Sequence, residues 1–415
     1  MRTEKVQRAK AKAERGHLGR PAGETPALRL TDHVALLLDW FAVNARELPW
    51  RGTLDPYAVW VSEIMLQQTQ VKTVIPYFER WMKTLPTIAV LAAAPSEQIH
   101  KLWEGLGYYT RVRNMQKAAQ AVVEKHGGTF PTNFDDVLDL PGIGRYTAGA
   151  ICSIAFNQAV PILDGNVIRV LTRLSGIREN AKEKASNARL WKLAEELVTA
   201  ASLRHSSFVI RHSLSGSCSA LNQSLMELGA LVCTPRQPQC KVCPLTRHCV
   251  ARREGLVEQL PNLGARAPAT ARRFAACVIE RAGKFLVRQR PSGVVNGHLW
   301  EFPNVETSPT ASDRATRQAL ESELRSTLVD WTPFMTVKHS ITRYRITLEV
   351  FRGTEPDGAA CADGGEWFHT TKLRQLPFTS AHRKVLEKLL REEDEPEFSL
   401  GSRVNLPRDG RVKKP

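Results

Sequence analysis

The stretch Leu140-Pro141-Gly142-Ile143-Gly144, followed by Arg145-Tyr146-Thr147-Ala148, predicts two helices joined by a glycine-containing hairpin. Residues 135–140 are typical of a short helix that Pro141 ends, and residues 145–156 of a second helix. Gly142 and Gly144 permit a tight turn with exposed backbone N–H groups. The N–H groups that begin the second helix lie at its positive end, where phosphates bind. The hairpin is therefore a candidate DNA contact, although the same pattern also occurs as a simple packing corner.

Downstream of the hairpin, four cysteines share the spacing C-x6-C-x2-C-x5-C. They are Cys233, Cys240, Cys243 and Cys249. Zinc sites usually offer two short pairs, and only the middle two cysteines form one, so the spacing favours a cubane iron–sulfur cluster over zinc. Disulfides fit least well, because the remaining cysteines are scattered singly and the chain shows no recognisable secretory signal.

The charge balance favours a polyanionic partner. The 415 residues include 58 Lys and Arg against 42 Asp and Glu, a formal net charge of +16. Such an excess favours nucleic acid over a membrane surface. No apolar run is long enough to span a membrane, and we expect no membrane association.

The hydrophobic periodicity divides the chain into two domains with basic tails. We expect a tail over 1–28, an all-helical domain over 29–260 that contains the cysteine loop (233–249), a linker over 261–270, and a tail over 393–415. Residues 271–392 alternate with a period near two and also contain helical segments, which predicts an α+β domain. Residues 203–218 are expected to form an inserted loop.

Several motifs in the same order resemble the MutY-type adenine DNA glycosylases over about residues 31–392. They are Leu48-Pro49-Trp50-Arg51, the run from Ser62 to Val71, Gly105-Leu106-Gly107-Tyr108-Tyr109, the hairpin, Leu163-Asp164-Gly165-Asn166-Val167 and the cysteine loop. The resemblance implies a helix-hairpin-helix glycosylase domain with an iron–sulfur loop, followed by a Nudix-like α+β domain. It also implies that the four cysteines hold a [4Fe-4S] cluster.

By this resemblance Glu63 is the catalytic acid and Asp164 the second carboxylate. A glutamate in an apolar pocket can hold a proton that adenine needs in order to leave, and can then activate water. Asp164 would stabilise the positively charged sugar, as in two-carboxylate glycosidases, and Asn166 would hydrogen-bond it. Without the resemblance, Glu63 could serve only the helix dipole near a helix start, and Asp164 could serve only as a helix N-cap.

Tyr146 separates the two kinds of glycosylase that the resemblance allows. In related bifunctional enzymes a lysine at this position attacks the sugar as a Schiff-base nucleophile, and tyrosine cannot form that adduct. The resemblance also implies DNA or base contacts by residues of four motifs. These are Trp50, Arg51, Gln67, Gln68, Thr69, Leu106, Tyr108, Gly142 and Gly144.

The second domain resembles the Nudix fold but lacks the hydrolase signature, since residues 315–328 offer only Glu321 and Glu323. In the family, this domain recognises 8-oxoguanine through a His-x-Phe-Ser-His loop. The corresponding run here is His339-Ser340-Ile341-Thr342-Arg343, in which Thr342 keeps the hydroxyl and the aromatic residue and second histidine are replaced. We expect His339 and Thr342 to contribute to that contact.

Together these observations predict a monofunctional base-excision repair enzyme that removes adenine opposite 8-oxoguanine or guanine in double-stranded DNA. We expect a monomer in the bacterial cytoplasm, associated with the nucleoid. Two alternatives stay open at this stage. One is a bifunctional glycosylase and AP lyase for oxidised pyrimidines, and the other is a non-catalytic iron–sulfur DNA sensor.

Overall fold

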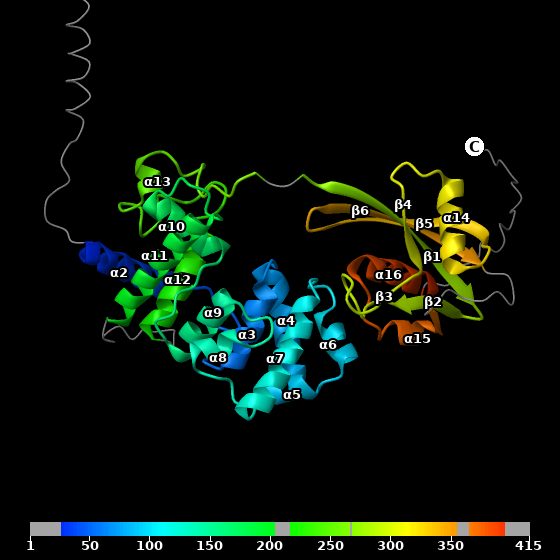
Figure 1. Ribbon diagram of the computed structural model, residues 1–415, viewed down its shortest axis with the longest axis horizontal. Helices are drawn as coiled ribbons and strands as arrows, with labels where there is room; N and C mark the ends of the chain where they lie inside the picture. The colour runs from blue at the N-terminus through cyan, green and yellow to red at the C-terminus, as the bar shows by residue number, and fades with distance from the viewer. Residues whose placement is uncertain (1–25, 204–215, 266–267, 355–364, 395–415) are drawn as a thin grey trace, which may run out of the picture. The chain divides into compact units, whose positions relative to one another are not determined.

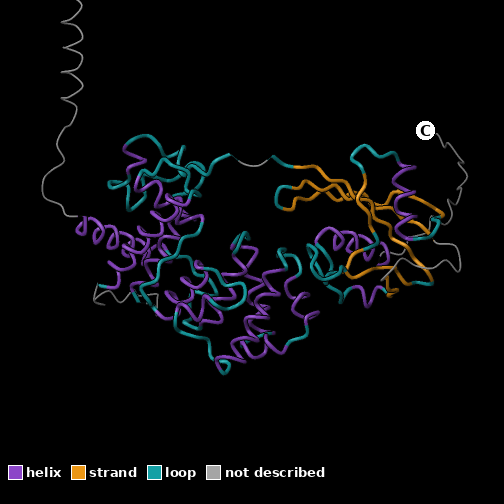
Figure 2. Tube along the Cα trace, viewed as in Figure 1, coloured by secondary structure: helices purple, strands orange, loops and turns teal. Residues whose placement is uncertain are grey.

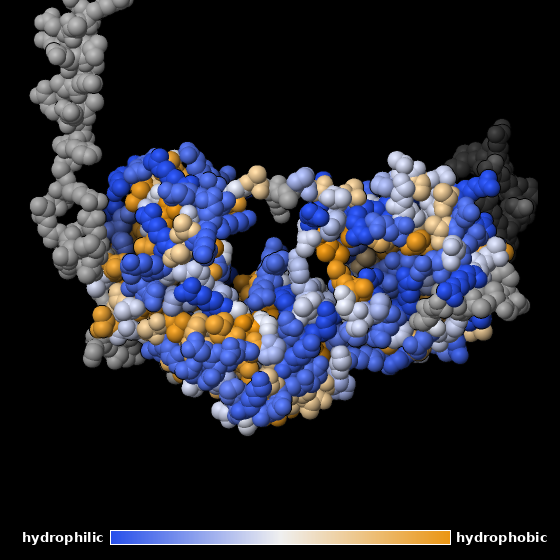
Figure 3. Space-filling model, in the orientation of Figure 1, coloured by the Kyte–Doolittle hydropathy of each residue, from blue (hydrophilic) through white to orange (hydrophobic). Residues whose placement is uncertain are grey.

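The computed structural model describes residues 26–203, 216–265, 268–354 and 365–394. The chain divides into a helical unit, residues 1–95 and 110–266, and a mixed unit, residues 96–109 and 267–415 (Figure 1). Most of both expected tails and of the expected insertion lies outside the described residues. Residues 26–28 and 393–394, which were expected in the tails, are helical. No described helix is long and apolar enough to cross a membrane. Hydrophilic residues cover much of the visible face of each unit (Figure 3).

The described part of the helical unit contains helices and no strand, which confirms the expected all-α class (Figure 2). Its helices are α2 (Pro26–Asn44), α3 (Pro56–Leu66), α4 (Val71–Thr84), α5 (Ile88–Ala93), α7 (Thr110–His126), α8 (Phe134–Leu138), α9 (Arg145–Phe156), α10 (Gly165–Ser175), α11 (Lys184–Ser202), α12 (Ser217–Leu231) and α13 (Val250–Arg253). Large apolar side chains such as Trp60, Trp81 and Met115 fill the core and are almost fully buried.

Two helix boundaries differ from the sequence expectation. The apolar pattern of the sequence predicts a helix that begins at Ser62 and breaks near Pro76. The helix begins instead at Pro56, where Asp55 caps it by accepting a hydrogen bond from the N–H of Tyr57. The predicted break is also wrong, because Pro76 lies inside α4. The chain breaks instead at residues 67–70, where Gln68 has a φ of 58°. Propensity locates a break only approximately, whereas a left-handed residue ends a helix outright.

The mixed unit has a twisted sheet with helices on both faces, as expected for an α+β domain. Its elements are α6 (Ser96–Trp103), β1 (Thr270–Arg281), β2 (Lys284–Gln289), β3 (Trp300–Glu301), β4 (Asn304–Thr307), α14 (Asp313–Leu324), β5 (Val329–Ile341), β6 (Tyr344–Thr354), β7 (Gly365–Phe368), α15 (Thr370–Leu373) and α16 (Ser380–Asp394). The strand order is β3-β2-β1-β6-β5, with β4 paired to β1 and β7 to β2. Strands β1 and β6 run parallel, and the other named pairs are antiparallel.

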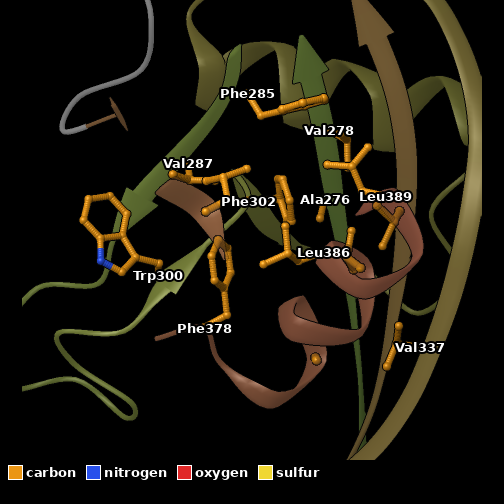
Figure 4. Packing of buried hydrophobic residues seen from close by; sticks show 14 of the residues in the cluster. Ala276, Val278, Phe285, Val287, Trp300, Phe302, Val337, Phe378, Leu386 and Leu389 are labelled. Atoms are coloured by element: carbon orange, nitrogen blue, oxygen red, sulfur yellow. The ribbon is translucent and has the colours of Figure 1, made fainter. Parts of the chain in front are cut away.

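Two clusters of buried apolar side chains pack the helices of the mixed unit against this sheet. One contains Leu386 and Leu389 of α16, which pack with Phe302 and Phe378 (Figure 4). The other contains Leu320 of α14 and inward-facing residues of β1. Each fully buried side chain of this size contributes about 1.5–3 kcal/mol relative to an exposed one.

Strand β5 was not predicted from the sequence. Its pairing with β6 shifts register between Val329 and Thr332 and again between Pro333 and Met335, so its side chains do not keep a simple alternation. Pro333 is tolerated because β5 is an edge strand. The sequence predicts one strand over 300–305, which the structure divides into β3 and β4.

Candidate active site and nucleic-acid interface

Glu63 and Tyr146 meet inside the helical unit, where α3 packs against α9. The Tyr146 hydroxyl donates a hydrogen bond to Oε2 of Glu63 at 2.6 Å and also lies 3.3 Å from Sδ of Met226. Only 6% of Glu63 is exposed. Glu63 lies three residues from the end of α3, so it faces the negative end of that helix. The helix-dipole role considered for Glu63 is therefore wrong.

The surroundings of Glu63 favour its protonated form. Burial raises the pKa of this carboxyl to about 7, against the lowering effect of the Tyr146 hydrogen bond. The charge of Asp164 raises this pKa further, and that of Arg51 lowers it. The pKa of Tyr146 is raised well above its usual value, mainly by burial, so the phenol keeps its proton. Near neutral pH the pocket therefore holds a carboxyl group that can exchange a proton.

Asp164 is both a helix cap and a member of this site. Its Oδ1 accepts a hydrogen bond from the N–H of Val167 at 2.7 Å, which caps α10 as the sequence allowed. Its Oδ2 accepts a hydrogen bond from Nδ2 of Asn166 at 2.8 Å. Burial raises the pKa of Asp164, and these two hydrogen bonds oppose the rise. The carboxylate is thus held in one orientation beside Glu63.

A buried charge network that the sequence did not reveal supports the pocket. Glu227 of α12 accepts hydrogen bonds from Arg51 at 2.8 Å and from Arg46 at 2.7 Å. Burial would raise the pKa of Glu227, but the two guanidinium groups lower it to about 2. Trp50, the neighbour of Arg51, is buried edge-to-face against Phe78 at 5.4 Å. A single glutamate in an apolar helix gives no sequence signal for such a partnership.

The hairpin has the geometry that the glycines predicted. Gly142 has a φ of 77°, and a Cβ there would lie 2.5 Å from Cβ of Asn114, so a side chain is excluded. Gly144 is the N-cap of α9, and no side chain caps the helix. Gly142 and Gly144 are both exposed. The first N–H groups of α9 are therefore directed to a surface that a phosphate can approach.

The residues expected to enter the duplex lie in two separate places. Gln67, Gln68 and Thr69 occupy the break between α3 and α4, where Nη1 of Arg111 donates to the carbonyl of Gln67 at 2.8 Å. Gln68 is exposed. Leu106 and Tyr108 belong to the mixed unit. Tyr108 there is 45% exposed and Leu106 is buried.

Gly105 and Gly107 predict an exposed turn that carries both Tyr108 and Tyr109, and this prediction is wrong for Tyr109. Only 2% of Tyr109 is exposed. Its ring lies 6.1 Å from that of His100 on α6. The motif gives two adjacent tyrosines, but only packing decides which of them turns inward.

The four cysteines surround one cavity. Its lining also includes Arg173, Val232, Thr246, Arg252 and Val257. The four are free thiols, so no disulfide competes for them. No three His, Cys, Asp or Glu side chains of the described residues converge as ligands of a single metal ion. Four thiols around one cavity, with Arg173 Nη1 3.4 Å from Sγ of Cys233, are a donor set that suits an anionic iron–sulfur cluster.

Hydrogen bonds connect this cavity with the carboxylate of Asp164. Nη2 of Arg169 donates to Oδ1 of Asn166 at 2.8 Å, and Nε of Arg169 donates to the carbonyl of Cys233 at 2.7 Å. Since Asn166 also donates to Asp164, a chain of three hydrogen bonds through Asn166 and Arg169 connects Cys233 with the Asp164 carboxylate. The cysteine loop and the short helix after it carry exposed basic side chains, which are Arg236, Lys241, Arg247, Arg252 and Arg253.

Arginines contact the two glutamates of α14, Glu321 and Glu323. Glu323 is paired with Arg288, and Glu321 accepts hydrogen bonds from Arg317 at 3.0 Å and from the N–H of Leu328 at 3.1 Å. Both glutamates of α14 are therefore committed to structural contacts. This agrees with the missing hydrolase signature.

The run from 339 to 343 forms the end of the β5–β6 hairpin. His339 is half-buried on β5, and burial lowers the pKa of its ring, with a further lowering by Lys384. Its Nδ1 is buried without a hydrogen-bond partner among the described residues. Thr342 is exposed in the two-residue turn with a φ of 52°. The hairpin thus presents a hydroxyl at its tip and a neutral imidazole behind it.

Each unit matches a known protein family, and the chain as a whole is similar to known enzymes. Residues 61–196 match the family described as HhH-GPD superfamily base excision DNA repair protein, and residues 275–388 match the NUDIX domain. The chain is 36% identical to the adenine DNA glycosylase of Rattus norvegicus, covering 84% of this chain and 76% of that protein. It is 35% identical to the human enzyme, covering 89% and 75%, and 38% identical to one from Buchnera aphidicola, covering 66% and 74%.

Proposed function

We propose, on the premise that this chain belongs to the adenine DNA glycosylases, that Glu63 and Asp164 are its two catalytic carboxylates. The chain is a base-excision repair enzyme that hydrolyses the N-glycosidic bond of adenine in DNA. The observation that carries the proposal is the buried contact between Glu63 and Tyr146. There a carboxyl group with a pKa of about 7 is held at a fixed position.

Glu63 acts first as a general acid. Adenine is a poor leaving group as an anion, and protonation of its N7 lets it leave as a neutral base. A carboxyl with a pKa near the working pH is suited to donate this proton and then to accept one from the attacking water. Tyr146 holds the carboxyl in place through its 2.6 Å hydrogen bond.

Asp164 stabilises the sugar after the bond breaks. The oxocarbenium-like ring carries positive charge at C1′, and a fixed carboxylate beside it lowers the energy of that state. The hydrogen bonds from Val167 and Asn166 fix the carboxylate before DNA arrives, so little reorganisation is needed during the reaction. Asn166 is therefore a positioning residue.

The enzyme is monofunctional in this proposal. Strand cleavage by β-elimination requires an amine on C1′, and the position beside Glu63 carries the Tyr146 phenol instead. This argues against the bifunctional alternative. The paired carboxylates argue against a non-catalytic sensor.

The preferred substrate is adenine opposite 8-oxoguanine, with adenine opposite guanine as a poorer one. The mixed unit supplies the lesion contact through His339 and Thr342, although its loop departs from the family pattern. The exposed hydroxyl of Thr342 donates to the carbonyl of Ile341 at 2.7 Å, so its oxygen would contact a base edge as an acceptor. The arginine-paired glutamates of α14 support a binding role for this unit and not hydrolysis.

DNA is held through the hairpin and through residues that fill the vacated space. Gly142 and Gly144 leave the N–H groups of α9 open to a phosphate. Trp50 and Arg51 line the adenine pocket. The residues that fill the space include Gln67, Gln68, Thr69, Leu106 and Tyr108. Base flipping costs a few kcal/mol, and an inserted side chain offsets part of that cost.

Cys233, Cys240, Cys243 and Cys249 hold a [4Fe-4S] cluster in this proposal. Their free thiols around one cavity, with Arg173 and Arg252 in its wall, suit a cluster of net negative charge. The cluster shapes a loop that presents exposed basic side chains to DNA. We further propose a monomer that works on chromosomal DNA in the bacterial cytoplasm.

One gel experiment tests the proposal. A duplex with A opposite 8-oxoguanine is incubated with excess enzyme, and half of each sample is heated with alkali. Wild type should give strand breaks only after alkali, and Glu63→Gln should bind the duplex but give at least about 10²-fold slower excision. Excision by Glu63→Gln at near wild-type rate would refute the assignment of the acid.

A further inference from the structure

Glu104, which no part of the proposed mechanism uses, is a buried carboxylate at the end of α6. Only 4% of its side chain is exposed. Its Oε1 accepts a hydrogen bond from the N–H of Phe378 at 2.8 Å. Its Oε2 lies 2.8 Å from Nζ of Lys101 and 3.1 Å from Nη1 of Arg383. A charged group buried this deeply is retained only if its partners satisfy it, as they do here.

The partners of Glu104 belong to the framework of the mixed unit. Phe378 is fully buried in the cluster beneath α16. The segment that contains it pairs with β3, because Trp300 donates to the carbonyl of Pro377 at 2.8 Å and Thr379 donates to that of Trp300 at 3.1 Å. Glu104 therefore satisfies a backbone N–H within the core of the unit.

Helix α16 connects Glu104 with the lesion-contact hairpin. Arg383 of this helix contacts Glu104, and the next residue, Lys384, is close enough to His339 to lower the pKa of its ring. Nζ of Lys388 donates to the carbonyl of Phe334 on β5 at 2.6 Å, which fixes the helix to the same hairpin. One helix thus contacts both places.

Glu104 also immediately precedes the turn that presents Tyr108. Gly105, Gly107 and Tyr108 have φ values of 105°, 70° and 47°, so the turn has one specific shape. Nε1 of Trp103 closes it by donating to the carbonyl of Gly107 at 3.0 Å. The base of the turn is fixed by Glu104, while the Tyr108 side chain is 45% exposed.

We propose that Glu104 is a specificity-determining positioning residue that couples the lesion-contact hairpin, through Arg383 and α16, to the turn carrying Tyr108. 8-Oxoguanine bound by the hairpin then favours the turn conformation in which Tyr108 enters the duplex, whereas guanine at the same position does not. The inference rests on the proposed function of Tyr108 and of the mixed unit. Glu104 contacts no reacting atom and sets discrimination, not the chemistry of adenine release.

The test compares Glu104→Ala, Glu104→Gln and the control Glu97→Gln in the full-length protein. Glu97 is a half-exposed glutamate of the same helix, 3.4 Å from Lys372. Single-turnover excision rates are measured on A:8-oxoguanine and A:G duplexes. We expect Glu104→Ala to lower the ratio of the two rates about tenfold, a usual size for coupling between sites. Glu104→Gln keeps an acceptor for the N–H of Phe378 and should recover part of the lost rate ratio. Glu97→Gln should keep the ratio within about twofold of the wild-type value.

Hydrogen exchange of the free proteins provides a second readout that does not depend on activity. The peptide containing Phe378 should exchange faster in Glu104→Ala than in wild type, because its amide loses a buried acceptor. Arg383→Gln, which removes a partner that is 40% exposed, replaces Glu104→Ala if that variant does not fold, and should lower the rate ratio in the same direction.

The outcomes separate two failures. A wild-type enzyme without preference for A:8-oxoguanine overturns the proposed function of the mixed unit together with the coupling. A wild-type preference that Glu104→Ala and Arg383→Gln leave within about twofold overturns only the coupling. Equal loss of rate on both duplexes also overturns it, because that result describes a structural role without discrimination.

Discussion

Replacing Glu63 with glutamine should stabilise the folded protein at alkaline pH while abolishing its chemistry. The side chain is buried, and its pKa is raised from the model-compound value of 4.5 to about 7. The folded state therefore holds the proton more tightly than the unfolded chain does. Below pH 4.5 Glu63 is protonated in both the folded and the unfolded state, and its ionisation does not lower the free energy of unfolding. The cost grows as the pH rises toward 7 and then stays constant.

The size of this cost follows from the shift. One pKa unit corresponds to about 1.4 kcal/mol, so the ionised Glu63 lowers stability by about 3 kcal/mol above pH 7. Glutamine keeps an acceptor for the Tyr146 hydroxyl but never ionises. For a helical unit of this size, about 2–4 °C per kcal/mol converts the difference into a melting temperature about 6–12 °C higher at pH 8.

Thermal melting followed by far-UV circular dichroism from pH 5 to pH 8.5 measures the effect. The difference between Glu63→Gln and wild type should be small at pH 5, increase as the pH approaches 7 and level off above it. Glu195→Gln on α11 is the matched control, since it removes the same charge from an exposed position. A difference that does not change with pH would show that Arg51 and Tyr146 outweigh burial, and the acid role of Glu63 would lose its physical basis.

Three further results are expected. Tyr146→Phe removes the hydrogen bond that lowers the pKa of Glu63, so the alkaline decline in single-turnover excision should move to higher pH, and a move to lower pH would contradict the assigned contact. Asp164→Asn should reduce excision by about 10²-fold or more with little change in melting temperature, because asparagine caps helices about as well as aspartate, and a large loss of stability would mean that capping is its main role. Cys240→Ser should yield protein with less iron by metal analysis and a lower melting temperature, whereas stoichiometric zinc in wild type would exclude the cluster.

The sequence predicted the helical elements near the site more accurately than the side-chain partnerships within it. The helix from 145 to 156 was predicted at its observed ends because Pro141 and two glycines define the hairpin locally. The role of Asp164 as an N-cap was confirmed for the same local reason. The pairing of Glu63 with Tyr146 joins positions 83 residues apart and follows from the packing of α3 on α9, so no local pattern reveals it.

The failures have a common physical origin. Strand β5 escaped prediction because its register shifts remove the alternation that identifies a strand. Tyr109 is buried and Tyr108 exposed, although the two are adjacent, because tertiary packing decided between them. Glu227 gave no signal at all, since a carboxylate that neutralises two arginines resembles any other glutamate in a helix.

If DNA binds as proposed, the first turn of α9 connects the phosphate contact with the reacting sugar through one rigid helix. The open N–H groups at Gly144 and the Tyr146 phenol are two residues apart on the same helix. One additional residue between them would rotate the phenol by about 100° around the helix axis, away from Glu63. The spacing between a bound phosphate and the adenine-bearing nucleotide is consequently defined along the strand itself. In the proposed function, such a fixed spacing selects one nucleotide along the strand by geometry, independently of the neighbouring sequence.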